Sequence, residues 1–127
     1  SYHGIPKKYF DKGDPYHCYC HKTTRLISEK FSSIKIKTTF QSRFGPQEWL
    51  QPYTDKTLEN LPKEGIKNVL TICPGFASDC VETLEEIQIQ AKESFLNSGG
   101  ENFDMVPCLN DNKDHIILLK SLIERNI

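Results

Sequence analysis

The chain has 127 residues, 37% of them hydrophobic and 26% charged, so it is long enough for one ordinary domain with a packed core, and wholesale disorder is not expected. Its 16 basic and 17 acidic side chains leave a net charge of -1, which argues against a nucleic-acid binder that works by bulk positive charge and against polybasic anchoring to a membrane. The longest apolar run covers residues 116–119, whereas a membrane span needs about 20 residues.

The first residues resemble the end of a strand that runs into a turn. Ser1 rather than Met begins the chain, and His3 is followed at once by Gly4 and then by Pro6. A native domain rarely starts at such a point. This beginning favours a piece of a longer protein whose N-terminal part is missing.

Helical and strand patterns alternate after that turn. Apolar residues at helical spacing, β-branched runs and Gly or Pro punctuation mark the boundaries. In chain order we expect a loop over 4–15, a helix from 14 or 15 to 31, a strand over 34–40, a loop over 41–52, a helix over 54–64, a strand over 68–73, a helix over 78–97, a strand over 103–109 and a helix from 111 or 112 to 125.

This order predicts an α/β fold. Strands that alternate with helices form a parallel sheet covered on both faces, with right-handed crossovers. In such sheets the ligand crevice lies beyond the carboxyl ends of the strands. Three segments occupy those ends, namely residues 3–6, 41–49 and 74–82.

His3 stands at the first of these strand ends. Its imidazole titrates near neutral pH, so it can bind a metal or carry a proton. A histidine that only caps the turn is the structural alternative.

Three acidic side chains follow the third strand end. Asp79, Glu82 and Glu86 are spaced i, i+3 and i+7, which in a regular helix places them along one face. Such a file of carboxylates can bind a cation or conduct protons out of a deep site. The alternative is structural, because Asp79 and Glu82 have the spacing of a capping box and acidic residues favour the first turn of a helix.

Other polar and aromatic residues carry weaker signals. Trp49, the only tryptophan, can pack on a flat ligand or simply pin its loop to the core. His17 and His21 have zinc-binding spacing, but no acidic residue stands between them and we expect a surface helix. The five cysteines contain no CxxC pair and are expected to be reduced thiols, mostly buried.

Taken together, three blocks of this sequence resemble the ferrochelatase family, whose members insert ferrous iron into a porphyrin. SYHGIP at residues 1–6 with GDPY at 13–16 is similar to the family signature. Residues 41–55 resemble its second block, and PGFASDCVETL at 74–84 resembles its third. The resemblance covers residues 1 to about 123.

The resemblance implies a role for individual residues. His3 matches the family's invariant histidine, held to be a metal ligand or the base that takes pyrrole protons, and Glu82 matches the acidic residue that faces it. Asp79 and Glu86 match positions on the path of metal or protons. Trp49 and Phe76 match aromatic positions near the macrocycle. Cys80 stands where some relatives have a histidine.

The resemblance also implies an architecture and a reaction. Residues 1–127 would be the C-terminal one of two similar Rossmann-like, three-layer α/β/α halves, and the missing N-terminal half would supply the other porphyrin wall. The substrates would be Fe²⁺ and protoporphyrin IX, with protohaem and two protons as products. We expect no tightly bound cofactor, no 2Fe–2S cluster, no nucleic-acid partner, and a cytoplasmic protein with at most peripheral membrane contact. The fragment alone would be inactive.

Two kinds of alternative stay open at this point. A cobalt or nickel chelatase of the same fold also uses a histidine at this strand end. A non-catalytic porphyrin- or metal-binding module, or a lobe like those of periplasmic binding proteins, would not need the three acidic residues.

Overall fold

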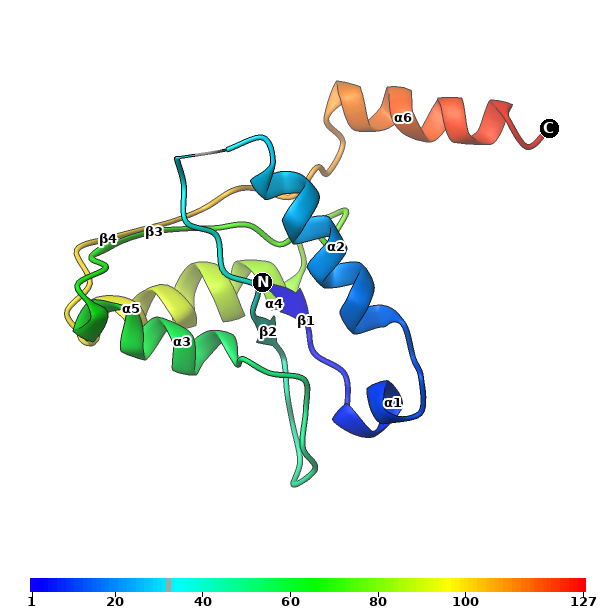
Figure 1. Ribbon diagram of the computed structural model, residues 1–127. Coiled ribbons are helices and arrows are strands. Elements are labelled where there is room, and N and C mark those ends of the chain that lie inside the picture. The colour runs from blue at the N-terminus through cyan, green and yellow to red at the C-terminus, as the bar shows by residue number, and fades with distance from the viewer. Residues whose placement is uncertain (32) are drawn as a thin grey trace.

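The computed structural model describes residues 1–31 and 33–127 (Figure 1). Short parallel strands alternate with helices, as the sequence predicts for an α/β fold. The elements are β1 (Tyr2–His3), α1 (Lys7–Asp11), α2 (Tyr16–Ser28), β2 (Phe40–Gln41), α3 (Thr54–Asn60), the 3₁₀ turn η1 (Leu61–Glu64), β3 (Asn68–Thr71), α4 (Val81–Leu84), the π-helical turn η2 (Glu86–Ala91), α5 (Lys92–Asn97), β4 (Asn102–Met105) and α6 (Lys113–Glu124).

The strands form two parallel pairs instead of the single sheet that the sequence predicts. β1 pairs with β2, and β3 pairs with β4. The amino group of Ser1 donates a hydrogen bond of 2.7 Å to the carbonyl of Ile72, so β1 begins beside the end of β3. The two pairs are thus separate ladders whose ends this bond joins.

Two expected strands are shorter than predicted, and one expected loop contains a helix. Of the predicted strand 34–40 only Phe40 pairs with β1, and its second partner, Gln41, comes from the predicted loop 41–52. The predicted strand 103–109 is replaced by β4, which ends at Met105. Residues 7–11 form α1 inside the predicted loop 4–15. The last residues of the predicted helix that ends at Phe31 lie outside α2, and Ser32 lies outside the described residues.

Helices cover the strands from two sides. Phe40 packs with Tyr2 and Cys20 in a core cluster on the side of α2. The next residue, Gln41, points the other way and donates to the carbonyl of Glu82. Because neighbouring side chains of a strand face opposite sides of a sheet, α2 and the α4 region lie on opposite faces, which gives three layers here.

A second core cluster joins α3 and the helix after β3 to the strands above them. Leu58, Ile87, Phe95 and Phe103 are buried in it. Figure 1 shows α3 and α5 side by side beneath β3 and β4. This cluster holds the helix that carries Glu82 and Glu86 against the strand ends.

The long helix predicted over 78–97 is neither continuous nor regular. It begins at Val81, with Cys80 as its N-cap, and passes through the π-helical turn before it ends at Asn97. In that turn the N–H of Gln90 donates to the carbonyl of Glu85, a 2.9 Å bond that spans five residues. Such turns change which side chains share a face, and they are frequent at functional sites.

The last helix stands apart from both clusters. α6 is capped by Asn112, whose side chain accepts the N–H of Asp114, and it has no buried residue. Figure 1 shows it projecting from the rest of the chain. Ile116 and Ile123, which share its apolar stripe, are more than half exposed. Among the described residues, no helix combines the length and the hydropathy needed to cross a bilayer.

Candidate functional site

His3 ends β1, where its backbone and its ring are both fixed. The hydroxyl of Tyr16 donates to the His3 carbonyl at 2.8 Å, and burial raises the pKa of Tyr16 above its ordinary value, so this donor keeps its proton. The ring atom Nδ1 lies 2.7 Å from the carbonyl of Gly4. Since a carbonyl oxygen only accepts, Nδ1 carries the hydrogen in this pair. Nε2 of the neutral ring then keeps a lone pair for a proton or a metal ion.

Two neighbours of His3 match the predicted site. The ring of Phe76 is 6.4 Å from the His3 ring, centroid to centroid, with the planes tilted by 44°. Glu82, in the first turn of α4, has its pKa held below the ordinary value. The largest cause is a hydrogen bond from the Cys80 side chain, and the charge of His3 contributes as well. His3, Phe76 and Glu82 therefore belong to one neighbourhood at the strand ends.

Asp79 faces a different part of the chain. Its Oδ2 accepts the side-chain amide of Asn110 at 2.7 Å, and its Oδ1 accepts the hydroxyl of Thr83 at 2.9 Å. These contacts, Asn110 first, lower the pKa of Asp79. Burial, with Asp79 adding to it, raises the pKa of the Cys108 thiol to about 12, so this thiol keeps its proton beside the carboxylate. The Asp79 carboxylate thus joins the start of α4 to residues 108–110.

The predicted capping box is displaced by one residue. The N–H of Cys80 donates to the hydroxyl of Thr83 at 3.0 Å, which places the box at Cys80 and Thr83 instead of Asp79 and Glu82. Asp79 therefore lies outside the helix. The prediction that three carboxylates lie along one regular helical face is wrong, because the helix starts after Asp79 and changes its period at Glu86.

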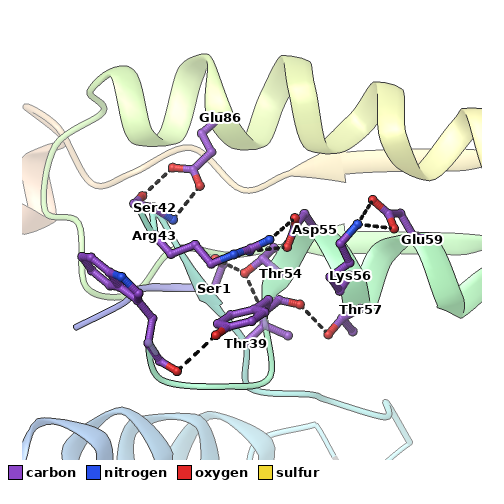
Figure 2. A network of polar contacts seen from close by, with 12 residues as sticks. Ser1, Thr39, Ser42, Arg43, Thr54, Asp55, Lys56, Thr57, Glu59 and Glu86 are labelled. Carbon is purple, nitrogen blue, oxygen red and sulfur yellow. Dashed lines mark hydrogen bonds and ion pairs between the residues drawn. The ribbon is translucent and has the colours of Figure 1, made fainter. Parts of the chain in front are cut away.

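Glu86 points toward the loop that follows β2 (Figure 2). Its Oε1 accepts the backbone N–H of Ser42 at 2.6 Å, and its Oε2 accepts the Ser42 hydroxyl. The side-chain amide of Gln41 donates to the Glu82 carbonyl at 2.6 Å and to Oε2 of Glu86 at 3.3 Å. A cavity of about 350 Å³ opens beside these groups, lined also by Arg43, Asp55 and Gln90.

Sequence reasoning named the segment 41–49 but missed what Gln41 and Ser42 do. Gln41 is only 3% exposed, and its amide oxygen accepts the Ser1 hydroxyl at 2.6 Å. A buried, fully bonded Gln cannot be told from a surface Gln by its neighbours in the sequence. Ser42 has φ +63°, a left-handed conformation that serine rarely adopts. The sequence therefore does not predict this conformation.

Trp49 is an anchor of its loop. It is 6% exposed, and its indole N–H donates to the Phe44 carbonyl at 3.0 Å. A side chain at Gly4 would meet the indole ring at 3.3 Å and the Gln41 carbonyl at 2.9 Å, so glycine permits this close packing. The arrangement agrees with the structural alternative for Trp49, a residue that pins its loop to the core.

The two histidines of α2 lie among aromatic side chains. The rings of His17 and His21 lie 4.3 Å apart between centroids with their planes tilted by 43°, and His17 is half-buried against Phe10 and Phe40 instead of lying on the surface. Within residues 1–31 and 33–127 no three His, Cys, Asp or Glu side chains are grouped to hold an ion. The five cysteines are free; Cys20 and Cys73 are buried, Cys18 is exposed and the other two are half-buried, so fewer are buried than predicted.

Comparisons with known proteins agree with the three sequence blocks. The ferrochelatase family profile matches residues 1–127. Proteins named ferrochelatase from Rhizobium meliloti, Marinobacter nauticus and Pseudoalteromonas atlantica are 57%, 56% and 54% identical over 129 aligned residues, which cover 100% of this chain. The chain spans 38%, 35% and 36% of those relatives' own lengths. The chain therefore belongs to the ferrochelatase family.

Proposed function

We propose that the protein containing this chain inserts Fe²⁺ into protoporphyrin IX, releases two protons and forms protohaem, and that residues 1–127 supply the side of the cleft where metal and protons are handled. The observation that carries the proposal is the position of His3 at a strand end, with its ring 6.4 Å from the ring of Phe76. Glu82 lies in the first turn of α4, the helix that follows β3, and its pKa is lowered first by the Cys80 side chain and then, to a smaller extent, by the charge of His3. The family of the chain supports the same reaction.

Each step asks for a group that this chain provides. Insertion of a divalent metal breaks two pyrrole N–H bonds, so a base must take each proton as the metal–nitrogen bonds form. We assign this task to Nε2 of His3, whose Nδ1 is bonded to Gly4. Glu82, kept ionised by its low pKa, balances the positive charge of the metal ion or of protonated His3.

Glu86 follows Glu82 by four residues in the chain and lines the cavity beside Ser42. We propose that it accepts protons from the His3 side and passes them to water there. Gln41 connects the two acidic residues, since its amide contacts the backbone of Glu82 and the carboxylate of Glu86. Asp79, whose oxygens accept hydrogen bonds from Asn110 and Thr83, is assigned a structural role in place of the path predicted for it.

A flat apolar substrate needs apolar walls. Phe76, half-buried beside His3, is proposed to contact the macrocycle, and Trp49 is proposed to hold the loop 41–49 at the porphyrin side of the cleft. The second wall is assigned to the part of the protein outside this chain, which would be the N-terminal of two similar halves. The proposal includes a cytoplasmic location, at most peripheral membrane contact, and no resident cofactor or iron–sulfur cluster.

The test is zinc insertion into protoporphyrin IX by the full-length protein, followed by fluorescence. His3→Ala should reduce turnover by at least about 10²-fold, the usual contribution of a general base. His21→Ala, at an exposed position of α2, is the matched control and should keep the wild-type rate. A folded wild type that binds porphyrin but turns over no metal would favour the binding module, and turnover only with a corrinoid or sirohaem precursor and Co²⁺ or Ni²⁺ would favour the other chelatases.

A further inference from the structure

The last residue of β2 and the residue after it donate three hydrogen bonds to one carboxylate, that of Glu86. Ser42 donates both its backbone N–H and its hydroxyl to Glu86, one to each carboxylate oxygen (Figure 2). The side-chain amide of Gln41 adds a third donor. An ionised carboxylate only accepts hydrogen bonds, so three converging donors suit it. We call these contacts of Ser42 and Gln41 with Glu86 the Glu86 clamp.

The backbone of Ser42 makes the clamp possible. Its φ of +63° is left-handed, and in this conformation its N–H and its side chain both reach Glu86. Non-glycine residues adopt this conformation infrequently, and asparagine and aspartate tolerate it better than most. Unfavourable backbone conformations are found mostly at functional sites. Ser42 adopts one while it contacts Glu86, the candidate proton carrier, so we infer that this conformation serves the contact.

The next residue ties the same loop to another helix. Both guanidinium nitrogens Nη1 and Nη2 of Arg43 donate to the Asp55 carboxylate of α3, at 2.7 and 2.8 Å. Arg43 thus has its own carboxylate partner. Glu82, on the preceding helical turn, and the thiol of Cys73 are further titratable groups near Glu86. The pKa of Cys73 is raised mainly by burial, and the charge of Glu86 adds to this.

We propose that Ser42 is a positioning residue for Glu86: it holds the carboxylate at the edge of the 350 Å³ cavity, in the orientation that accepts protons from the His3 side. This inference rests on the proposed function. Without the clamp the carboxylate turns freely into the cavity, and proton transfer slows while substrate binding is unchanged. A displaced catalytic group costs up to about 10²-fold in rate.

Three substitutions at one position separate the donor from the backbone. Ser42→Asn and Ser42→Asp have nearly the same shape and both tolerate positive φ, but only asparagine offers Glu86 a donor. Ser42→Gly keeps the N–H and removes the hydroxyl. Arg43→Gln is the matched control, because it removes the other anchor of the loop without a direct contact to Glu86.

The measurement is kcat and both KM values for zinc insertion by the full-length protein. We expect Ser42→Asn to stay within about threefold of the wild type, Ser42→Gly to fall between the other two, and Ser42→Asp to lose about ten- to hundredfold in kcat at an unchanged porphyrin KM. In a Glu86→Gln background the Asn and Asp variants should become equal. Arg43→Gln should keep most of kcat.

The outcomes separate this inference from the proposed function. Equal rates for Ser42→Asn and Ser42→Asp, or a difference that survives Glu86→Gln, would overturn the positioning role while leaving the reaction in place. A loss in Arg43→Gln as large as in Ser42→Asp would show that only the loop's placement matters, which also overturns it. A folded wild type without turnover would overturn the proposed function and the positioning role together.

Discussion

The strand-end region around His3 and the last helix, α6, differ sharply in how this chain stabilises them. At the strand ends nearly every polar group has a partner: Gln41 makes four polar contacts, and Glu86 accepts from the Glu86 clamp. Among the described residues no buried side-chain nitrogen or oxygen lacks a hydrogen bond. α6 has a capped start but no buried residue.

Contacts between different elements fix the strand ends, whereas local contacts within the helix and around its cap fix α6. The site geometry is built from contacts inside residues 1–127, because hydrogen bonds from neighbouring elements orient His3, Glu86 and the loop between them. α6 is ordered by its own backbone bonds, its cap and local contacts such as that of His115 Nδ1 with the Asn110 carbonyl, 2.7 Å away. Its apolar stripe has no counterpart in the described residues. Substitutions in the two regions should therefore have very different costs.

The largest effect on stability is expected at Ile87, which is 1% exposed in the core cluster beneath the site. Ile87→Ala removes buried methyl groups and leaves a cavity, which costs about 2–5 kcal/mol. Urea unfolding of the 127-residue chain, with the neighbouring exposed Gln88→Ala as control, measures this cost. A loss of less than about 1 kcal/mol would mean that the helix after β3 is not held by this core.

A smaller, pH-dependent effect is expected at Asp79. Its folded-state pKa lies below the ordinary value of 3.8, so the ionised carboxyl contributes stability above that pH and loses it as the pH falls through the folded-state pKa. In Asp79→Asn an NH₂ group replaces one of the two carboxylate oxygens. One of the hydrogen bonds from Asn110 and Thr83 is then lost, because two donors face each other. At pH 7 the variant should be less stable by about 1 kcal/mol or less, because solvent screens a half-exposed carboxylate.

Unfolding of both proteins across the acid range measures this dependence. The difference between wild type and Asp79→Asn should shrink between about pH 5 and pH 2. A difference that stays constant across this range would contradict the assignment of its origin to the ionised carboxylate.

The smallest effect is expected in α6. Ile123 is 61% exposed, so Ile123→Ala in the 127-residue chain should change the free energy of unfolding by less than about 0.5 kcal/mol. Urea unfolding beside Ile87→Ala makes the comparison direct. A cost near that of Ile87→Ala would show that α6 is packed, and the contrast between the two regions would fail.

Much of the architecture follows from local patterns in the sequence. The order of strands and helices, the start of α6 near Asn112 and the parallel pairing are predicted from periodicity and punctuation. The lengths of β1 and β2 are not, because a strand extends only as far as its partner, and partners are distant in sequence.

The site shows the same division. His3 is found from its place at a strand end, since that rule depends only on the order of elements. The π-helical turn at residues 86–91 and the φ of Ser42 depend on tertiary contacts, so the direction of Glu86 does not follow from helical spacing. The Asp79 carboxylate is placed by Asn110, a residue 31 positions away in the chain.

The most direct test of the whole account compares Glu82→Gln with Asp79→Asn in the full-length protein, measured as zinc insertion into protoporphyrin IX and as porphyrin affinity. The account predicts that Glu82→Gln loses about 10²-fold or more in turnover at unchanged porphyrin affinity, whereas Asp79→Asn keeps most of its turnover. Turnover that survives Glu82→Gln, or that disappears equally in a folded Asp79→Asn, would contradict the placement of the chemistry at His3 and Glu82.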